Sequence, residues 1–332
     1  MKKVKQTDYL FLSANLRARE VNMLTAERIS RMVAAPDAAE AARILTECGY
    51  PELRDTDDVS LELAIAARRQ QLLEEIERLC PEKALVTCFR MRYDYHNAKV
   101  LIKSIGAEVD AERVFSPCGR VSVAQLMDAV YNDSPDGLPP AFARALYDSR
   151  MTLARTGNPR LSDIVLDRAH YAEILAAARE LSSPFFGSYI RFCVDRCNLR
   201  ALVRCQRAGM DYSAFAASLI EGGEISLGRF SEQNYSVEGV TRVFDFGLLK
   251  DAAKLGAAAV EGESLSPFDL ACDNAGNTFL QRAQAVSFGQ ESVVAFFLSL
   301  EGEFTAVRML MQCKKLGMSA AEIWGRMRES YV

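Results

Sequence analysis

A short set of polar residues recurs along the chain at a spacing that brings side chains together. The pattern is Asp-x-x-Asn followed two positions later by a basic residue, and it occurs at Asp94, Asn97 and Lys99 and again at Asp195, Asn198 and Arg200. Residues three apart share a helix face, so Asp and Asn point in one direction while the basic residue points elsewhere. A carboxylate and an amide on one face can bind polar groups of a partner or of a neighbouring segment.

A third copy of this pattern is degraded. Glu303 and Arg308 keep the carboxylate and the basic residue five positions later, but Ala306 replaces the amide. The three acids lie 101 and 108 residues apart. A period this long exceeds the roughly 20–50 residues of thin solenoid repeats. We therefore predict a small helical subdomain used three times, with repeats at residues 1–136, 137–240 and 241–332.

The repeated polar set has two interpretations. In one, these groups face a central partner; in the other, they bridge helices within each copy and satisfy buried polar groups. Repetition favours the structural interpretation, because a unique active site need not occur three times. The loss of the amide at Ala306 also indicates that this group is not needed in every copy.

The segments that position these residues are predicted to be helical, at 61–79, 82–105, 161–181, 185–208 and 292–316. The last two are the long core helices of copies two and three, and each ends at a glycine with basic residues in its last turn. Ser122, with Gln125 three residues later, fits a capping box. Ser319 is predicted to cap a final helix that runs to the C-terminus. Because no convincing strand pattern occurs, the predicted fold is all-α.

The third copy lacks one element of the other two. Segments Gly119–Ser122 and Gly223–Ser226 follow the polar set in copies one and two, whereas the sequence ends at Val332 before a counterpart. Near the N-terminus, Thr25 is placed to cap a short helix. We predict that residues 1–35 complete the third repeat in space and that the repeats close into a ring.

Composition restricts the function classes. The 332 residues are 49% hydrophobic, and 40 basic against 44 acidic residues leave a net charge of −4, which argues against a nucleic-acid binder. Apolar runs are far shorter than a membrane span, and no signal peptide is recognisable. These features predict a cytoplasmic protein that does not insert into the membrane. The nine cysteines form no Cys-x-x-Cys pair and fit buried small side chains in a reducing compartment.

Enzyme motifs for nucleotide, zinc-hydrolase or serine-hydrolase chemistry are missing, and the chain has only two histidines. We therefore expect no catalytic residues, no cofactor and no metal. An all-α enzyme that works with scattered carboxylates would require a cleft in which two carboxylates converge with perturbed pKa values.

Several segments together resemble the C subunit of the V-type and A-type ATP synthases, whose eukaryotic relative is the V-ATPase d subunit. The resemblance covers nearly the whole chain and rests on the order and spacing of Arg17–Glu20, Asn97–Lys99, Gly157–Pro159, Asn198–Arg200 and Phe288–Glu303. Departures are Ala98 in place of the usual Leu, Ala306 in place of Asn, and many Cys and Met residues.

The resemblance implies a funnel of three helical bundles related by pseudo-threefold symmetry. It implies a non-catalytic central-stalk component, peripherally attached to the membrane through the complex. Its partners would be the rotor-shaft subunits of the D and F type and the membrane ring of subunits that carry protons or sodium ions. The alternative is a soluble helical-repeat adaptor unrelated to a rotary motor, although such adaptors usually use many short repeats.

Overall fold

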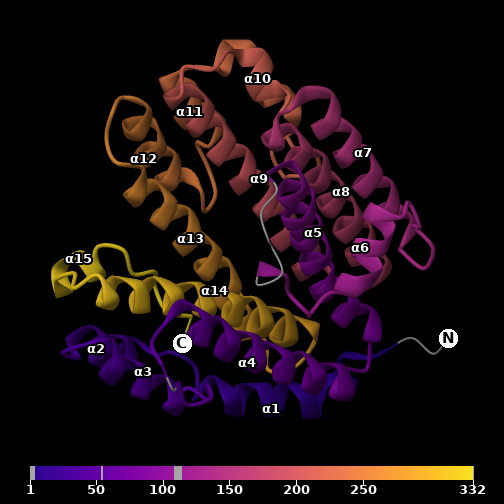
Figure 1. Cartoon of the computed structure of the whole chain (residues 1–332). Helices are drawn as coiled ribbons and strands as arrows, with labels where there is room; N and C mark the ends of the chain where they lie inside the picture. The colour runs from indigo at the N-terminus through magenta and orange to yellow at the C-terminus, as the bar shows by residue number, and fades with distance from the viewer. Residues whose placement is uncertain (1–3, 54, 108–113, 332) are drawn as a thin grey trace. The chain divides into compact units, whose positions relative to one another are not determined.

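The computed structural model describes residues 4–53, 55–107 and 114–331, and every regular element in those ranges is helical. The predicted all-α fold is therefore confirmed. Figure 1 shows these helices along the chain. The chain is organised in two compact units. The first comprises Met1–Pro81, Gln206–Ala208 and Gln233–Val332, and the second comprises Glu82–Cys205 and Gly209–Glu232.

The first unit contains nine α-helices in its described residues. They are α1 (Leu10–Glu20), α2 (Ala26–Ala34), α3 (Ala38–Glu47), α4 (Asp58–Leu79), α11 (Val237–Val243), α12 (Lys250–Val260), α13 (Leu265–Gln281), α14 (Gln290–Lys315) and α15 (Ala320–Trp324). Two 3-10 turns belong to it, η1 (Gln6–Tyr9) and η5 (Arg282–Ala285), and η4 (Glu232–Asn234) begins at its boundary.

The second unit is built from α5 (Lys83–Ala107), α6 (Val123–Tyr131), α7 (Pro140–Thr156), α8 (Pro159–Glu180), α9 (Pro184–Arg207), α10 (Tyr212–Ala216) and the 3-10 turn η3 (Leu227–Arg229). The last two residues of α9 belong to the first unit. Helix α8 packs against both α7 and α5. The core between them is apolar and includes Tyr95, Leu101, Leu126, Phe142 and Leu166.

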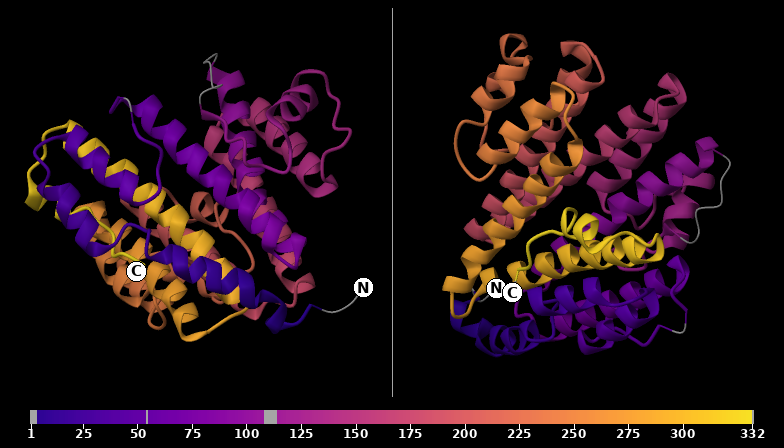
Figure 2. Two further views of the ribbon diagram at one scale, coloured as in Figure 1. Left: turned by 90° about the horizontal axis from the view of Figure 1, so that it is seen from below. Right: turned by 90° about the vertical axis from the view of Figure 1, so that its left-hand side faces the viewer.

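Helix α14 is the centre of the first unit. Most of its residues are buried, including Phe296, Phe297 and Phe304, so the helix is apolar on nearly all sides. Helices α1, α2 and α3 all pack against it, and α15 packs against α2 (Figure 2). The N-terminal and C-terminal parts of the sequence therefore share one core.

The predicted helix caps are confirmed. The Thr25 side chain accepts a hydrogen bond from the Arg28 amide at the start of α2, and Ser122 and Gln125 form the capping box of α6. Ser319 caps α15. The prediction that this helix runs to the C-terminus is wrong, because α15 ends at Trp324 and residues 325–331 are not helical.

A common order of elements underlies the repeated sequence. Each long core helix, α5, α9 or α14, follows another long helix, α4, α8 or α13, and only the 3-10 turn η5 intervenes between α13 and α14. A shorter helix or turn precedes each pair of long helices in the sequence. Helix α2 precedes α4 and α5, α6 precedes α8 and α9, and the turn η3 precedes α13 and α14. The boundaries at 136/137 and 240/241 and the closure of the repeats into a ring stay predictions.

Candidate functional site

The acids of copies one and two bind the backbone of a later loop. Asp94 Oδ1 accepts hydrogen bonds from the Arg120 and Val121 amides at 2.8 and 3.1 Å. Asp195 accepts from the Glu224 and Ile225 amides at 2.9 and 3.2 Å. Both acids are at most 4% exposed. We call such an acid, with the backbone groups that it binds, a loop anchor.

The third anchor joins distant parts of the sequence. Glu303 accepts a hydrogen bond from the Leu24 amide at 2.7 Å and another from the Tyr50 hydroxyl at 2.8 Å. Leu24 directly precedes the helix cap Thr25, just as Val121 and Ile225 precede Ser122 and Ser226. The Leu24 segment thus donates to the acid of α14, as the later loops donate to the acids of α5 and α9.

Glycine is required beside the first two anchors. A Cβ atom on Gly119 would lie 2.5 Å from Asp94 Oδ1, and one on Gly223 would lie 2.0 Å from Asp195 Oδ1. Both distances are too short for a carbon–oxygen contact. The glycine in each loop therefore lets the carboxylate approach the next two amides.

The asparagines form a second tie to the same loops. Asn97 exchanges two hydrogen bonds with the backbone of Ser116, both at 2.8 Å. Asn198 exchanges two with the backbone of Ile220, both at 2.9 Å. Each asparagine is 1% exposed. A side-chain amide suits this task because it offers a donor and an acceptor side by side.

In copy three two other asparagines make this exchange. The Asn277 side chain donates to the Glu329 carbonyl at 2.6 Å, and the Glu329 amide donates to Asn274 Oδ1 at 3.0 Å. Both asparagines lie on α13, not on the core helix α14. The backbone of the non-helical C-terminal tail, residues 325–331, therefore receives the pair of bonds that Ala306 cannot provide.

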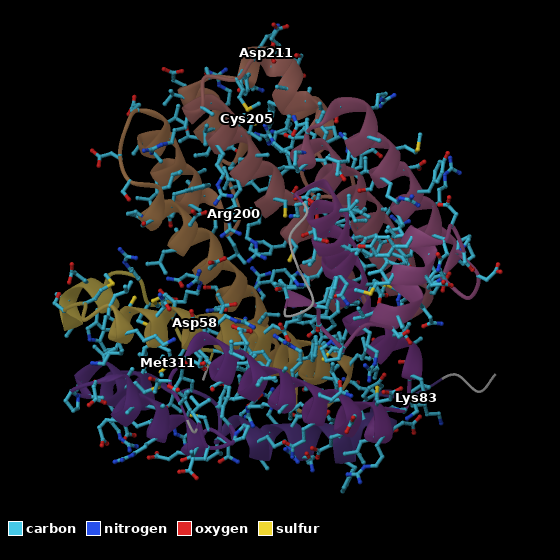
Figure 3. All side chains as sticks on the ribbon, viewed as in Figure 1. Asp58, Lys83, Arg200, Cys205, Asp211 and Met311 are labelled. Carbon is cyan, nitrogen blue, oxygen red and sulfur yellow. The ribbon has the colours of Figure 1, made fainter. Side chains whose placement is uncertain are left out.

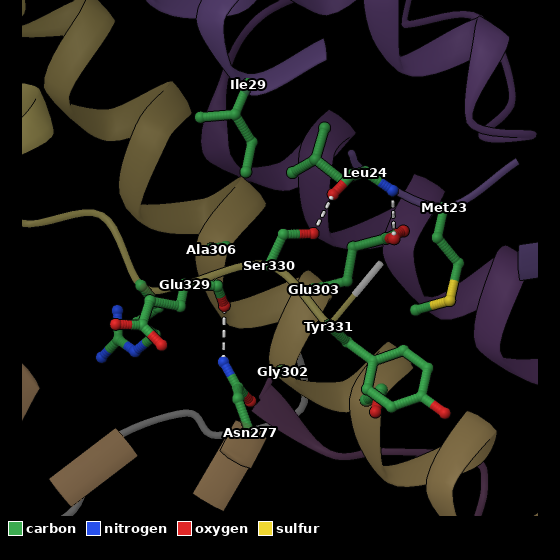
Figure 4. Close-up of a pocket in the computed structure, with 12 residues that line it drawn as sticks. Met23, Leu24, Ile29, Asn277, Gly302, Glu303, Ala306, Glu329, Ser330 and Tyr331 are labelled. Carbon is green, nitrogen blue, oxygen red and sulfur yellow. Dashed lines mark hydrogen bonds between the residues drawn. The ribbon is translucent and has the colours of Figure 1, made fainter. Parts of the chain in front are cut away.

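The tail meets the N-terminal segment at this point. The Ser330 hydroxyl donates to the Leu24 carbonyl at 2.9 Å, and Gln281 and Gln284 donate to the Ser330 and Tyr331 carbonyls. A cavity of 30 Å³ remains beside Ala306 (Figure 4). It is large enough for only one or two water molecules.

Two of the three basic residues of the motif pair with acids on other helices. Lys99 pairs with Asp167 of α8 at 2.5 Å, and Arg308 pairs with Glu62 of α4 at 2.5 Å. Arg200 lies on α9 with a half-buried side chain (Figure 3). Lys99 thus joins α5 to α8, and Arg308 joins α14 to α4.

Burial sets the electrostatics of the anchors. Loss of solvent raises the pKa of Asp195 to about 6, although its two backbone donors act in the opposite direction. Burial also raises the pKa of Asp94, despite the Arg120 guanidinium 2.5 Å away, and that of Glu303. Because these carboxylates are occupied by backbone donors, their geometry suits loop positioning and not acid–base chemistry.

Among the described residues no group of His, Cys, Asp and Glu could hold a metal ion. The nine cysteines are unbridged, and all but Cys197 are buried. Sequence reasoning missed Tyr50, Asn274 and Asn277, because their partners are more than 50 residues away and no local pattern indicates them.

We predict that Gly223→Ala destabilises the second unit by about 1–3 kcal/mol, because the new Cβ displaces the Asp195 carboxylate. Urea unfolding followed by circular dichroism measures this change. Gly228→Ala is the matched control, since nothing lies within 4 Å of its Cβ position, and should stay within about 0.5 kcal/mol of wild type. Equal stability of the two variants would contradict the role assigned to Gly223.

The raised pKa of Asp195 predicts a pH effect. An acid whose pKa is higher in the folded state takes up a proton on folding between its unfolded value and about 6. Above that pH range the charged Asp195 carboxylate destabilises the folded state. Protonation removes this destabilisation as the pH falls through the range. Wild type should therefore gain stability relative to Asp195→Asn when the pH is lowered from about 7 to about 4.5.

The comparison is made by urea unfolding at both pH values. Asp211→Asn is the control, because the Ala214 amide lowers the pKa of the exposed Asp211. The difference in free energy of unfolding between Asp211→Asn and wild type should stay constant between these pH values or change in the opposite direction. A flat difference for Asp195→Asn would mean that the burial of this carboxylate has no effect on its titration.

We predict that Asn277→Ala loosens the tail, because it removes the donor to the Glu329 carbonyl. Loss of one such hydrogen bond should accelerate hydrogen exchange of the tail amides about tenfold, measured by mass spectrometry. Thr278→Ala on the exposed face of the same helix should leave these rates unchanged. Equal rates in both variants would show that this amide does not hold the tail.

The described helices include none with an apolar stretch long enough to cross a membrane. Comparison with curated proteins finds the C subunit of a V-type sodium ATPase of Enterococcus hirae, which is 23% identical over 98% of this chain and 99% of its own length. The C subunits of the A-type ATP synthases of Methanococcoides burtonii and Methanobrevibacter smithii are 24% and 23% identical over 65% of this chain. These two alignments span 64% and 59% of the relatives.

The sequence profile of the family described as ATP synthase (C/AC39) subunit matches residues 12–326, nearly the whole chain. The match includes all three anchor acids and the Leu24 segment that completes the third anchor. The chain therefore belongs to the ATP synthase (C/AC39) subunit family.

Proposed function

We propose that this protein is a non-catalytic central-stalk subunit of a rotary V/A-type ATPase or ATP synthase. It would act as a socket that couples the rotor shaft to the membrane ring during proton or sodium transport. The observation that carries this proposal is the family match over residues 12–326. In the same proposal the three repeats form a pseudo-threefold funnel, which receives shaft subunits of the D and F type and seats on the ring.

The anchors support a mechanical role. Each fixes an irregular loop to a long core helix through a buried carboxylate, and in the first two copies an asparagine adds a second tie. A part that transmits torque must resist deformation, and closely packed helices with satisfied polar groups do so. Loops without such ties would yield before the load reached the helices.

The ion pairs between helices support the same role. Lys99–Asp167 and Arg308–Glu62 each connect two long helices, in the second and the first unit respectively. Partly exposed pairs of this kind contribute little to stability, so they add only modestly to the stiffness that the anchors provide. In the proposed complex the protein would be cytoplasmic and attached to the membrane only through its partners.

Coupling without catalysis makes a specific prediction. In a reconstituted complex, adding this protein should restore ATP-driven ion transport into vesicles. It should leave ATP hydrolysis by the isolated catalytic head unchanged, because the protein would transmit rotation and would not act on nucleotide. Transport and hydrolysis are measured in parallel, with heat-unfolded protein as the control.

Binding to the shaft is tested separately by native mass spectrometry of this protein mixed with shaft subunits from the same source. A complex with one copy of this protein per shaft supports the socket. If no complex forms over a wide range of protein and salt concentrations, the socket proposal fails and the helical-repeat adaptor becomes the favoured alternative. The adaptor would also leave ion transport unrestored.

A further inference from the structure

A polar cavity in the first unit lies beside Tyr50, whose hydroxyl binds the acid of the third anchor, and has no assigned role. Its volume is 150 Å³, and it is lined by Arg19, Asn22, Gly49, Arg68, Gln71 and Leu72. These residues come from α1 and the turn after it, from the end of α3 and from α4. The lining contains two guanidinium groups and two side-chain amides, but no carboxylate.

Arg68 is the unusual member of this set. It is 7% exposed, and its Nε atom is buried without a hydrogen-bond partner. One nitrogen donates to the Gly49 carbonyl at 3.1 Å, and the guanidinium lies 5.1 Å from the centre of the Tyr50 ring. In the described part of the chain no carboxylate forms an ion pair with Arg68. The buried Glu303 carboxylate interacts electrostatically with Arg68 but forms no ion pair with it, so the Arg68 Nε atom still lacks an acceptor.

The other groups complete a donor set. Arg19 binds Asn15 and Glu75 through Nε and Nη2, and these contacts hold its guanidinium at the cavity wall. Asn22 and Gln71 are exposed residues that add side-chain amides to the lining of the cavity. Glu303 is not among the residues that line this cavity, and its two oxygens accept hydrogen bonds from Leu24 and Tyr50.

Gly49 provides the space for Arg68. Its φ of 79° lies in the left-handed region, and a Cβ atom there would lie 2.5 Å from Arg68 Nη1. A side chain at this position would therefore push the guanidinium out of place. The end of α3 is shaped so that Arg68 can stay buried at the wall of the cavity.

We propose that this cavity binds a phosphate group, carried either by inorganic phosphate or by a small phosphate monoester. Arg68 and Arg19 would provide forked donors that match tetrahedral oxyanions, and Asn22 and Gln71 would bind the remaining oxygens. The volume suits one phosphate group with some water, since sites for larger ligands measure about 300–1,000 Å³. A phosphate group bound in this cavity would link α1 to α4 next to Leu24.

The test uses the full chain and isothermal titration calorimetry at constant ionic strength, with inorganic phosphate in one arm and glycerol 3-phosphate in the other. Saturable binding of either ligand supports the site, and the stronger arm identifies the source of the phosphate group. The proposal is overturned if a titration with potassium chloride gives the same binding signal. It is also overturned if neither ligand gives a saturable heat at millimolar concentration.

Variants locate the binding. Arg68→Gln should weaken phosphate binding about tenfold or more, because charge-assisted hydrogen bonds are lost. Arg43→Gln removes an exposed, Glu40-paired charge outside the cavity and should bind like wild type. If Arg68→Gln does not fold, Gln71→Leu serves instead and should bind severalfold more weakly. Wild-type affinity in the folded cavity variants would overturn the assignment.

Discussion

The structure depends on one recurring interaction, a buried carboxylate on a long helix that accepts the backbone amides of a loop. Loop amides have no helical partner, and a buried amide without an acceptor costs about 1–3 kcal/mol. A single Asp or Glu accepts hydrogen bonds from these amides just before the chain begins a helix or a 3-10 turn. The hydrogen bonds that these amides donate offset the free-energy cost of burying the acid, so the core helix can pass through an apolar core.

The same task is achieved with different chemistry in each copy. The carboxylate of Asp94 has a guanidinium partner in Arg120, Asp195 relies on backbone donors, and Glu303 uses one amide and the Tyr50 hydroxyl. The amide tie moves from the core helix to α13 in copy three. What persists is the position of the acceptor, whereas the residues around it have diverged.

Much of the fold was predictable because its signals are local. Caps such as Thr25 and Ser122, and helix ends at glycine, depend on neighbours within a few residues. The acids and asparagines were identifiable from their repetition, but their partners were not. Tyr50 and Asn277 act through contacts that only the folded chain creates, and the tail after Trp324 is non-helical where its backbone is bound by α13. Sequence pattern alone cannot anticipate such competition between helix formation and side-chain donors.

The third anchor has a consequence for how the polypeptide reaches this state. Leu24 and Glu303 are 279 residues apart, and Leu24 and Ser330 are 306 apart, so these hydrogen bonds span most of the sequence. The second unit is formed entirely by residues that lie between Leu24 and Glu303 in the sequence. During synthesis that unit would be completed first, while α1 to α4 wait for α14. Closing so long a loop is slow, and the waiting helices would expose apolar faces that chaperones recognise.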